Sequence, residues 1–466
     1  MKNIFDHPAL QSELRLLSSW TDARRIWDRI PGISVGIVHE GVLVWEKGFG
    51  YSDPEKEVPA DSRTIYRVAS ISKLFTSTAV MQLRDAGKLD LDAPISEYLD
   101  WFDIKDRFLD SPPITLRHLM THTSGLPREA AFYYWADFNF PTRDQIMETL
   151  PGQKTIFPRE TRWKYSNLAL ALAGEVVAAV SGVSYEKYIL NNILSPLNMN
   201  STSVELSQEH KKRLARGYGR LYPEGKRREV PFTDAKGIAP AANISSTVED
   251  LAKFIAFHMS DGKVNGQNIL KKSTVREMQR IQWIEPDWKS GWGLGFSLRT
   301  DGKRTLAGHG GSIQGYRTQL TFCTDEKLGI IVLTNASNAN PGMYVDKFFK
   351  LLSPVIEKIR EERIEVPEPD PGWEKFCGKY RNDWCDGEVM IYNGELVMID
   401  PGEENPEETI ARFIPAGDQI FRLEADSGFM RIGEPVQFIM NPDNTVEKVN
   451  FGDTYMYPVQ TWNERI

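Results

Sequence analysis

Ser70 and Lys73 have the residue types and the spacing of a nucleophile and its base. They lie three positions apart in RVASISKLF, residues 67–75. A serine hydroxyl is a weak nucleophile that needs an adjacent base, and residues at i and i+3 share one face of a helix. A lysine can act as that base when burial lowers its pKa towards neutrality. The pair therefore predicts covalent catalysis by a serine.

The spacing alone does not identify the nucleophile, because Ser184 and Lys187 match it as well. Ser184 stands at an expected helix start, where serine is a preferred N-cap residue. Ser70 instead precedes the run LFTSTAVMQL, at the predicted buried N-terminus of a core helix that extends to about Gly87. Free backbone N–H groups and the helix dipole favour negative charge at such a position. This context favours Ser70 as the nucleophile.

Two further motifs complete a candidate site. WKYSNLAL contains Tyr165 and Asn167 as Y-x-N, and GHGGSIQGY contains His309 and Gly311 as H-x-G. Each motif occurs a second time, in residues 380–382 and 39–41. The glycines of the third motif would allow a strand to approach the substrate closely, which a Cβ would obstruct. Only the copies at 165 and 309 have the order and setting of one site together with Ser70.

The elements that must position these residues indicate an α+β fold. Two β-rich runs flank the turn at 39–41, and residues 316–335 predict a hairpin around 325–327. The section between them is rich in helix starts. Strands at both ends that enclose helices can share one antiparallel sheet, so we expect an antiparallel sheet flanked by helices, with an all-helical subdomain.

A second domain is expected at the C-terminus. Three prolines within VPEPDPGW favour extended backbone and predict a linker over residues 363–372. The following segment has six to eight short strands, among them a hairpin at Asn393-Gly394. We expect residues 1–362 to form the catalytic domain and residues 373–466 a small antiparallel, lipocalin-like β-barrel.

Composition excludes several function classes. The chain has 466 residues and a net charge of −8, which disfavours binding to nucleic acid or anionic membranes. No apolar run reaches the roughly 18 residues of a membrane span. The N-terminus lacks a signal peptide, so a soluble cytoplasmic protein is expected, with a secreted mature form as the alternative. Cys323, Cys377 and Cys385 are expected to be thiols, with a pair between the last two as the alternative.

The three motifs and ITLRHLMTHTSGLP, residues 114–127, resemble the serine β-lactamase-like hydrolases. This family includes class C β-lactamases, DD-peptidases, D-aminopeptidases, family VIII esterases and the wider CubicO group. The resemblance covers about residues 15–355 and implies a β-lactamase/transpeptidase-like fold. It implies that Ser70 forms an acyl-enzyme and that Lys73 and Tyr165 share proton transfer. Asn167 would orient substrate and lysine, and the backbone N–H groups of Ser70 and Ser312 would form the oxyanion hole.

Departures from the family bear on the substrate. His309 stands where β-lactamases usually carry lysine, and a neutral histidine is a poor partner for a substrate carboxylate. We therefore expect a small ester or a D-amino-acid peptide as substrate. β-Lactamase or DD-carboxypeptidase activity, acyl transfer and a non-catalytic sensor remain alternatives. Glu160 and Asn243 replace usual glycines and are expected at the pocket rim.

Other features leave alternatives open. The aromatic segment of residues 131–140, AFYYWADFNF, is expected either to form an apolar wall of the site or to pack between subdomains. His118 and His122 have a spacing that zinc sites use, but no H-E-x-x-H motif is present. We expect no metal and no cofactor. The barrel could serve as an interface for a homo-oligomer.

Overall fold

The computed structural model describes residues 3–260, 262–264, 267–425 and 432–463. Its internal contacts divide the chain into two compact units. One unit is Ile30–Val345, and the other joins Met1–Arg29 to Asp346–Ile466. The domain boundaries expected at 362 and 372 remain a prediction, since contacts group the first 29 residues with the C-terminal part of the chain.

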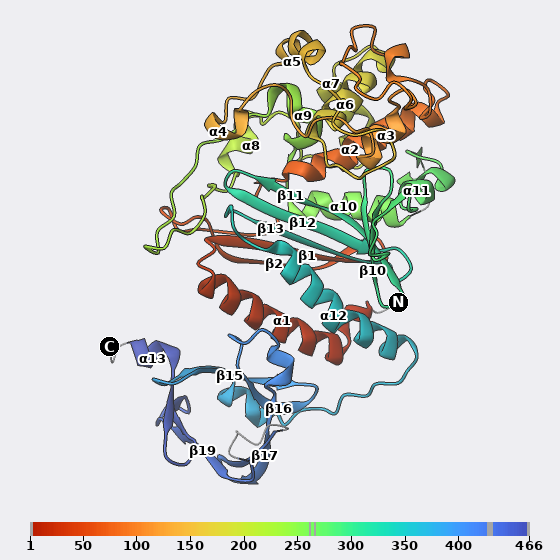
Figure 1. The fold of residues 1–466 in the computed structure, drawn as a ribbon. Helices are drawn as coiled ribbons and strands as arrows, with labels where there is room; N and C mark the ends of the chain where they lie inside the picture. The colour runs from red at the N-terminus through yellow and green to blue at the C-terminus, as the bar shows by residue number, and fades with distance from the viewer. Residues whose placement is uncertain (1–2, 261, 265–266, 426–431, 464–466) are drawn as a thin grey trace. The chain divides into compact units, whose positions relative to one another are not determined.

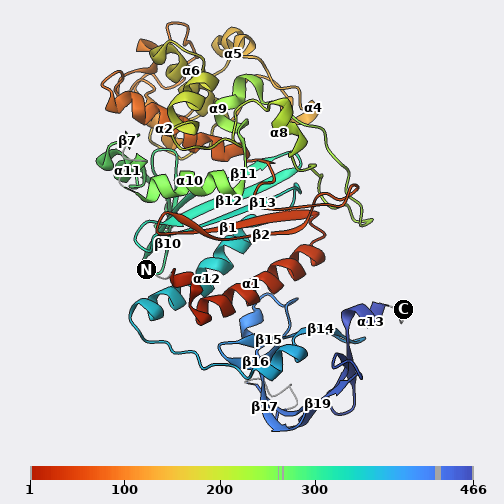
Figure 2. The same cartoon turned by 180° about the vertical axis from the view of Figure 1, so that it is seen from behind.

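A nine-stranded antiparallel sheet runs through the unit Ile30–Val345 in the order β3-β2-β1-β13-β12-β11-β10-β9-β8. Its first and last long strands are neighbours, with Ile33 opposite Thr334, which confirms the expected pairing of the terminal strands (Figure 2). The strands are β1 Gly32–His39, β2 Val42–Asp53, β3 Val58–Pro59, β8 Trp283–Ile284, β9 Ser290–Trp292, β10 Ser297–Asp301, β11 Arg304–Ile313, β12 Tyr316–Cys323 and β13 Leu328–Thr334.

Helices of this unit gather on one side of the sheet (Figure 1). Helix α10 packs on β1 and β13, while α2 packs against α6 and α9. One continuous apolar core joins these helices to the sheet. The helices are α2 Ser72–Asp85, α3 Leu116–Thr121, α4 Tyr134–Asp137, α5 Arg143–Thr149, α6 Asn167–Ser181, α7 Tyr185–Ile189, α8 Gln208–Lys212, α9 Ala239–Ala242, α10 Val248–Met259 and α11 Lys272–Met278.

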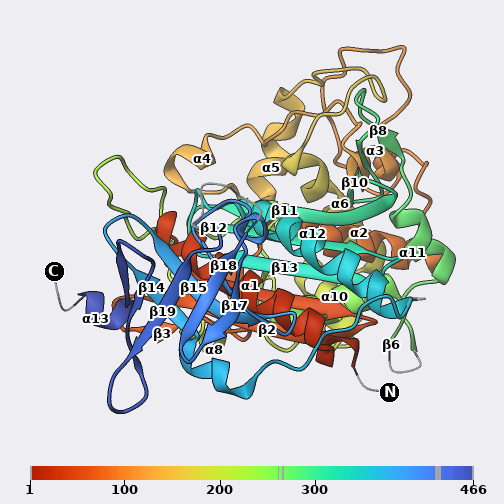
Figure 3. The same ribbon diagram turned by 90° about the horizontal axis from the view of Figure 1, so that it is seen from below.

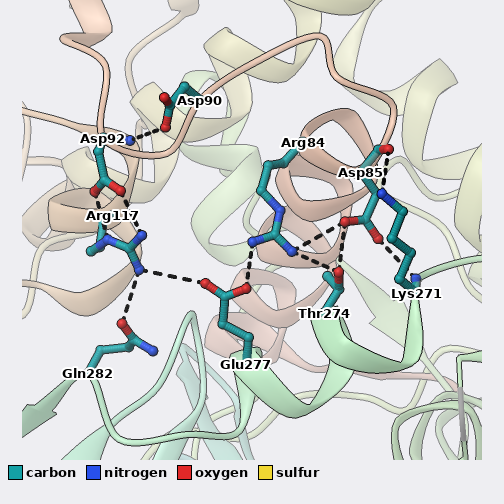
Figure 4. Close-up of polar contacts among 9 residues, drawn as sticks. All are labelled: Arg84, Asp85, Asp90, Asp92, Arg117, Lys271, Thr274, Glu277 and Gln282. Carbon is teal, nitrogen blue, oxygen red and sulfur yellow. Dashed lines mark hydrogen bonds and ion pairs between the residues drawn. The ribbon is translucent and has the colours of Figure 1, made fainter.

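A network of charged side chains anchors the C-terminal end of α2 (Figure 4). Arg84 donates to Glu277 of α11 over 2.5 Å and to Thr274 over 2.7 Å. Glu277 also lies 3.8 Å from Arg117 of α3, which pairs with Asp92 at 2.7 Å. The network therefore ties the helix that follows Ser70 to two other helices, at the end remote from the serine.

The other unit contains a closed barrel of eight antiparallel strands, which confirms the expected C-terminal barrel (Figure 3). Buried aromatic side chains, including Phe413, Phe421 and Phe438, fill its interior. The predicted turn has both residues at positive φ, 50° for Asn393 and 82° for Gly394, as a tight hairpin requires. The strands are β14 Gly378–Arg381, β15 Asp386–Tyr392, β16 Glu395–Ile399, β17 Ala411–Gly417, β18 Ile420–Glu424, β19 Pro435–Met440, β20 Val446–Asn450 and β21 Tyr455–Pro458.

The N-terminal helix α1, Pro8–Trp27, packs on this barrel. Ser19 donates a hydrogen bond to Glu388 over 2.7 Å, and Tyr392 donates to Glu13 over the same distance. Helix α12, Pro341–Arg360, leads into the segment that precedes the barrel. All three cysteines are free thiols, as expected.

Within the described ranges, no single helix is long and apolar enough to cross a membrane. Two consecutive segments, Asn167–Ser181 and Tyr185–Leu194, are together long and apolar enough for a membrane span by length and composition alone, but the chain bends by 77° between them.

Candidate active site

Ser70 lies in the short 3₁₀ helix η2, Ala69–Ile71, immediately before α2. The predicted helix of residues 70–87 thus begins with a 3₁₀ turn, and its α-helical part is Ser72–Asp85. Ala69 has a φ of 48°, in the left-handed region that costs a residue with a Cβ about 1–2 kcal/mol. Such strain is typical of functional sites, and here it adjoins the candidate nucleophile.

Lys73 is completely buried beneath Ser70. Its Nζ lies 3.2 Å from Ser70 Oγ, 2.8 Å from Asn167 Oδ1 and 2.8 Å from the carbonyl oxygen of Ala241. Burial lowers the pKa of Lys73 well below its ordinary value, and the negative charge of Glu129 opposes this effect in part. The structure therefore favours a neutral amine at this position.

The partners of Nζ determine where the lone pair of a neutral amine points. Asn167 Oδ1 and the Ala241 carbonyl can only accept hydrogen bonds, so they take the two N–H groups. The remaining partner is the hydroxyl of Ser70, which can donate. In a neutral amine the lone pair is then left for the proton of Ser70, the arrangement that general-base activation requires.

Tyr165 lies on the other side of the serine. Its hydroxyl donates to Ser70 Oγ over 2.7 Å, and burial raises its pKa above the ordinary value. The tyrosine is therefore a protonated phenol that can supply a proton. Ser70 Oγ accepts from Tyr165, and when the amine of Lys73 is neutral it can donate to that amine, so both neighbours can be satisfied at once.

The segment of residues 114–127 holds Tyr165 in place. The carbonyl of His122 accepts the N–H of Lys164 over 2.8 Å, and its Nδ1 accepts the N–H of Ser166 over 3.2 Å. The ring of His122 lies 4.5 Å from the ring of Tyr165, between centroids. His122 thereby fixes the backbone on both sides of the tyrosine.

The structure gives no support to a zinc site at His118 and His122. Nε2 of His118 lies 3.2 Å from a carboxylate oxygen of Glu160, and its Nδ1 accepts the N–H of Thr115. Across the residues that the structure describes, no group of three or more His, Cys, Asp or Glu could hold a metal ion. Glu160, at a φ of 58°, adopts the left-handed conformation that glycine takes most readily.

Strand β11 brings the third motif to the serine. A Cβ on Gly311 would lie 2.2 Å from the carbonyl oxygen of Val68 and from Thr318 Oγ1. The glycine thus permits β11 to approach the segment that carries Ser70, whereas the sequence had suggested an approach to the substrate. Ser312, the expected oxyanion residue, follows on the same strand.

His309 is neutral in this environment. It is 4% exposed, and chiefly its burial lowers its pKa to about 3. Its Nδ1 lies 2.6 Å from the carbonyl oxygen of Gly310, while Nε2 has no hydrogen-bond partner among the described residues. This low pKa agrees with the expectation that the histidine supplies no positive charge, which stays a prediction.

Ser70, both residues of the Y-x-N motif and the third motif line an open cleft with a volume of about 770 Å³. Three tryptophans form its apolar walls, and the rings of Trp163 and Trp292 are stacked with centroids 4.9 Å apart. Of the aromatic segment 131–140, Trp135 lines the cleft while Tyr134 and Phe140 are buried in the core, so the segment serves as both wall and packing. The lining includes Ser70, Arg128, Trp135, Trp163, Tyr165, Asn167, Trp292, His309, Gly311, Ser312 and Arg317.

Asn243, expected at the pocket rim, lies elsewhere. It is buried, and its Oδ1 accepts hydrogen bonds from Arg67 over 2.8 Å and from the N–H of Ala235 over 2.9 Å. Its neighbour Ala242 lines the cleft instead. Ser184 is the N-cap of α7, as expected, and its Oγ accepts the N–H of Lys187.

Sequence reasoning missed Glu129. Its Oε1 accepts a hydrogen bond from Asn167 Nδ2 over 2.8 Å, which makes it a second neighbour of the candidate base. A single carboxylate in GLPRE has no spacing that marks a function. Only its place directly after the 114–127 string could have drawn attention to it.

Comparison with known proteins agrees with this geometry. The model of the protein family described as Beta-lactamase matches residues 21–353. Among curated proteins, Beta-lactamase-like protein 2 of Dictyostelium discoideum is 28% identical over 388 residues. That alignment covers 80% of this chain and 70% of the relative.

Solved structures of two proteins illustrate the similarity of the fold. The octameric penicillin-binding protein homologue of Pyrococcus abyssi is 26% identical, with a TM-score of 0.65 over 95% of this chain and 99% of that one. The beta-lactamase/D-alanine carboxypeptidase of Yersinia pestis, complexed with citrate, is 23% identical, with a TM-score of 0.62 over 74% of this chain and 98% of that one. The expected β-lactamase/transpeptidase-like fold is confirmed.

Proposed function

The chain belongs to the Beta-lactamase family, and from this premise we propose that it is a serine hydrolase that works through an acyl-enzyme on Ser70. One observation carries the proposal. Ser70 Oγ lies between the amine of Lys73, at 3.2 Å, and the phenol of Tyr165, at 2.7 Å. A base and an acid therefore contact the same hydroxyl from two sides.

The chemistry follows from the protonation states. Neutral Lys73 takes the proton of Ser70 as Oγ attacks the acyl carbon. The N–H groups of Ser70 and Ser312 stabilise the oxyanion, and removal of one such donor typically costs about 10²–10³ in rate. Tyr165 gives its proton to the leaving group and regains one from the Lys73 ammonium. A water molecule, activated by the same pair, then hydrolyses the acyl-enzyme.

The preferred substrate is a small acyl ester or a D-amino-acid amide. Neutral His309 offers no charge for the carboxylate of a β-lactam, and the walls at Trp163 and Trp292 suit an apolar acyl group. A carboxylated peptide, as in DD-carboxypeptidase activity, is the second candidate. Arg128 and Arg317 in the cleft lining favour it, because a guanidinium can hold a carboxylate.

Initial rates on p-nitrophenyl butyrate and D-alanine p-nitroanilide test the proposal, with Ser70→Ala as the blank. We expect Ser70→Ala to abolish turnover and Ser184→Ala, at the matched S-x-x-K, to keep the full rate. Turnover of the ester alone identifies an esterase, and turnover of the anilide a D-amino-acid peptidase. Full activity of Ser70→Ala would refute Ser70 as the nucleophile. No turnover of either substrate by the wild type would favour the sensor or the acyltransferase alternative.

We also propose that the chain forms a homo-oligomer through its barrel. The support is the similar chain from Pyrococcus abyssi, which is described as octameric and is covered over 99% of its length. Native mass spectrometry of the full-length protein measures the assembly directly. A monomer at micromolar protein concentration would contradict the proposed homo-oligomer.

A further inference from the structure

A chain of hydrogen bonds joins Lys73 to the aromatic segment 131–140. Asn167 Oδ1 accepts from Lys73 over 2.8 Å, and Asn167 Nδ2 donates to Glu129 Oε1 over 2.8 Å. The hydroxyl of Tyr134 donates to the other carboxylate oxygen of Glu129. The carboxylate therefore stands between a residue of the cleft and a buried aromatic residue of α4.

The chemistry of a carboxylate makes this chain directional. An ionised carboxylate can only accept hydrogen bonds, so the amide of Asn167 must turn its NH₂ group towards Glu129. Its Oδ1 then faces Lys73. With the amide reversed, an N–H of Asn167 would point at Lys73 and compete with Ser70 for the lone pair. By orienting the amide of Asn167, Glu129 thus leaves the lone pair of Lys73 to Ser70 and not to Asn167.

The backbone holds Glu129 against the start of α6. The carbonyl of Arg128 accepts the N–H of Asn167 over 2.8 Å, and the carbonyl of Glu129 accepts from Gln153 Nε2 over 3.0 Å. The Nε of Arg128 also lies 3.2 Å from Glu129 Oε1. The side chain of Glu129 is 18% exposed, so it is largely shielded from water.

We propose that Glu129 is a positioning residue, locked by Tyr134, that orients Asn167 so that Lys73 directs its lone pair at Ser70. The inference rests on the proposed function, since it concerns how the base of that reaction is aimed. It assigns to Glu129 no contact with the reacting atoms.

The charge of Glu129 adds a measurable consequence. Glu129 raises the pKa of Lys73, against the larger lowering by burial and the lowering by Arg128. His122 and His309 have pKa values lowered chiefly by burial and are neutral, and the phenol of Tyr165 is uncharged. Glu129 is therefore the one negative group that the structure sets against Lys73 among the described residues. Its neutralisation should lower the pKa of the base.

The variant Glu129→Gln separates the role of Glu129 as a hydrogen-bond acceptor from the effect of its negative charge. Glutamine keeps an oxygen that accepts from Asn167 and loses the charge. We expect catalysis to persist while the acid limb of the kcat/KM profile for p-nitrophenyl butyrate moves to lower pH. Glu129→Ala removes the acceptor as well, and should lower kcat/KM by about 10²-fold, the cost of a misplaced catalytic group.

A pair of adjacent tyrosines provides the control. Tyr134→Phe removes the donor to Glu129 but keeps the ring that packs 4.6 Å from Phe140, between centroids. We expect a smaller fall in kcat/KM with an unchanged melting temperature. Tyr133 is 93% exposed, so Tyr133→Phe should leave the rate unchanged.

The outcomes separate this inference from the proposed function. If the wild type is inactive or Ser70→Ala is active, the function itself fails. Suppose that the wild type is active and Ser70→Ala is inactive, as expected. The inference is then overturned if the acid limb of the kcat/KM profile does not move in Glu129→Gln and the rate does not fall in Glu129→Ala. An equal loss of rate in both Glu129 variants, with equally lowered melting temperatures, would also overturn it, because glutamine would then fail to restore the orientation.

Discussion

The hydroxyl of Tyr165 lies 2.7 Å from Oγ of Ser70, although 95 positions separate the two residues in the chain. The backbone carbonyls of His122 and Arg128 hold the second motif, since they accept the N–H groups of Lys164 and Asn167 on either side of Tyr165. The two motifs themselves meet through the hydrogen bonds from Tyr165 to Ser70 and from Lys73 to Asn167.

Tyr165→Phe should lower the turnover of p-nitrophenyl butyrate by about 10²-fold or more, the usual contribution of a positioned acid or base. Lys73 still faces Ser70 in this variant, so a slow acylation should remain. Because burial raises the pKa of Tyr165, the wild type should show no loss of rate from its ionisation at mildly alkaline pH. Stopped-flow measurement of p-nitrophenol release checks both points, and a fully active variant would exclude Tyr165 from proton transfer.

Gly311→Ala should impair turnover severely. The new Cβ would lie 2.2 Å from the carbonyl of Val68, so β11 must move away from the segment of Ser70. A shift of about 1 Å at a reacting group can cost about 10²-fold in rate. Gly152→Ala is the matched control, because a Cβ there meets nothing within 4 Å. Equal kcat values for the two variants would contradict the role of the close approach.

His258 should make the fold sensitive to acid. Burial lowers its pKa to about 3, from 6.5 in the unfolded chain. Between these values the unfolded state binds a proton that the folded state does not, so stability falls as the pH decreases from about 6.5 towards 3, by up to about 4 kcal/mol. His258→Phe should reduce this loss, since the ring lies among Phe254, Phe257 and Phe296.

Urea unfolding of His258→Phe and the wild type at pH 7, 5.5 and 4.5 measures the effect. His309, with its pKa also at about 3, keeps part of the dependence in both proteins. The same decline in stability for the variant and the wild type would show that His258 does not contribute.

Glu277→Gln should weaken the attachment of α2 without a change in kcat. The pair between Arg84 and Glu277 has side chains 24% and 25% exposed, so its loss should cost about 1 kcal/mol of unfolding free energy. The difference should shrink at high salt, because screening weakens partly exposed charge pairs. Thermal unfolding at two salt concentrations tests this, and a loss of turnover would mean that the network of Figure 4 also supports Ser70.

Local patterns determined much of what the sequence predicted. The hairpin at Asn393-Gly394 and the N-cap at Ser184 follow from turn and capping chemistry over a few residues. Ser70 and Lys73 share a helix face because their separation is three. Such features depend on neighbours in the chain, and the sequence contains them in full.

The tertiary structure alone decided how the candidate site is arranged. Glu129 and Asn167 are 38 positions apart, and no periodicity links them. The direction of the Lys73 lone pair depends on Asn167 and on the carbonyl of Ala241, 168 positions away. The grouping of α1 with the barrel likewise rests on contacts between the two ends of the chain. Motif spacing indicates which groups can react. Burial and hydrogen-bond partners determine the protonation of those groups and the direction of their hydrogen bonds, and they arise only when segments distant in the chain come into contact.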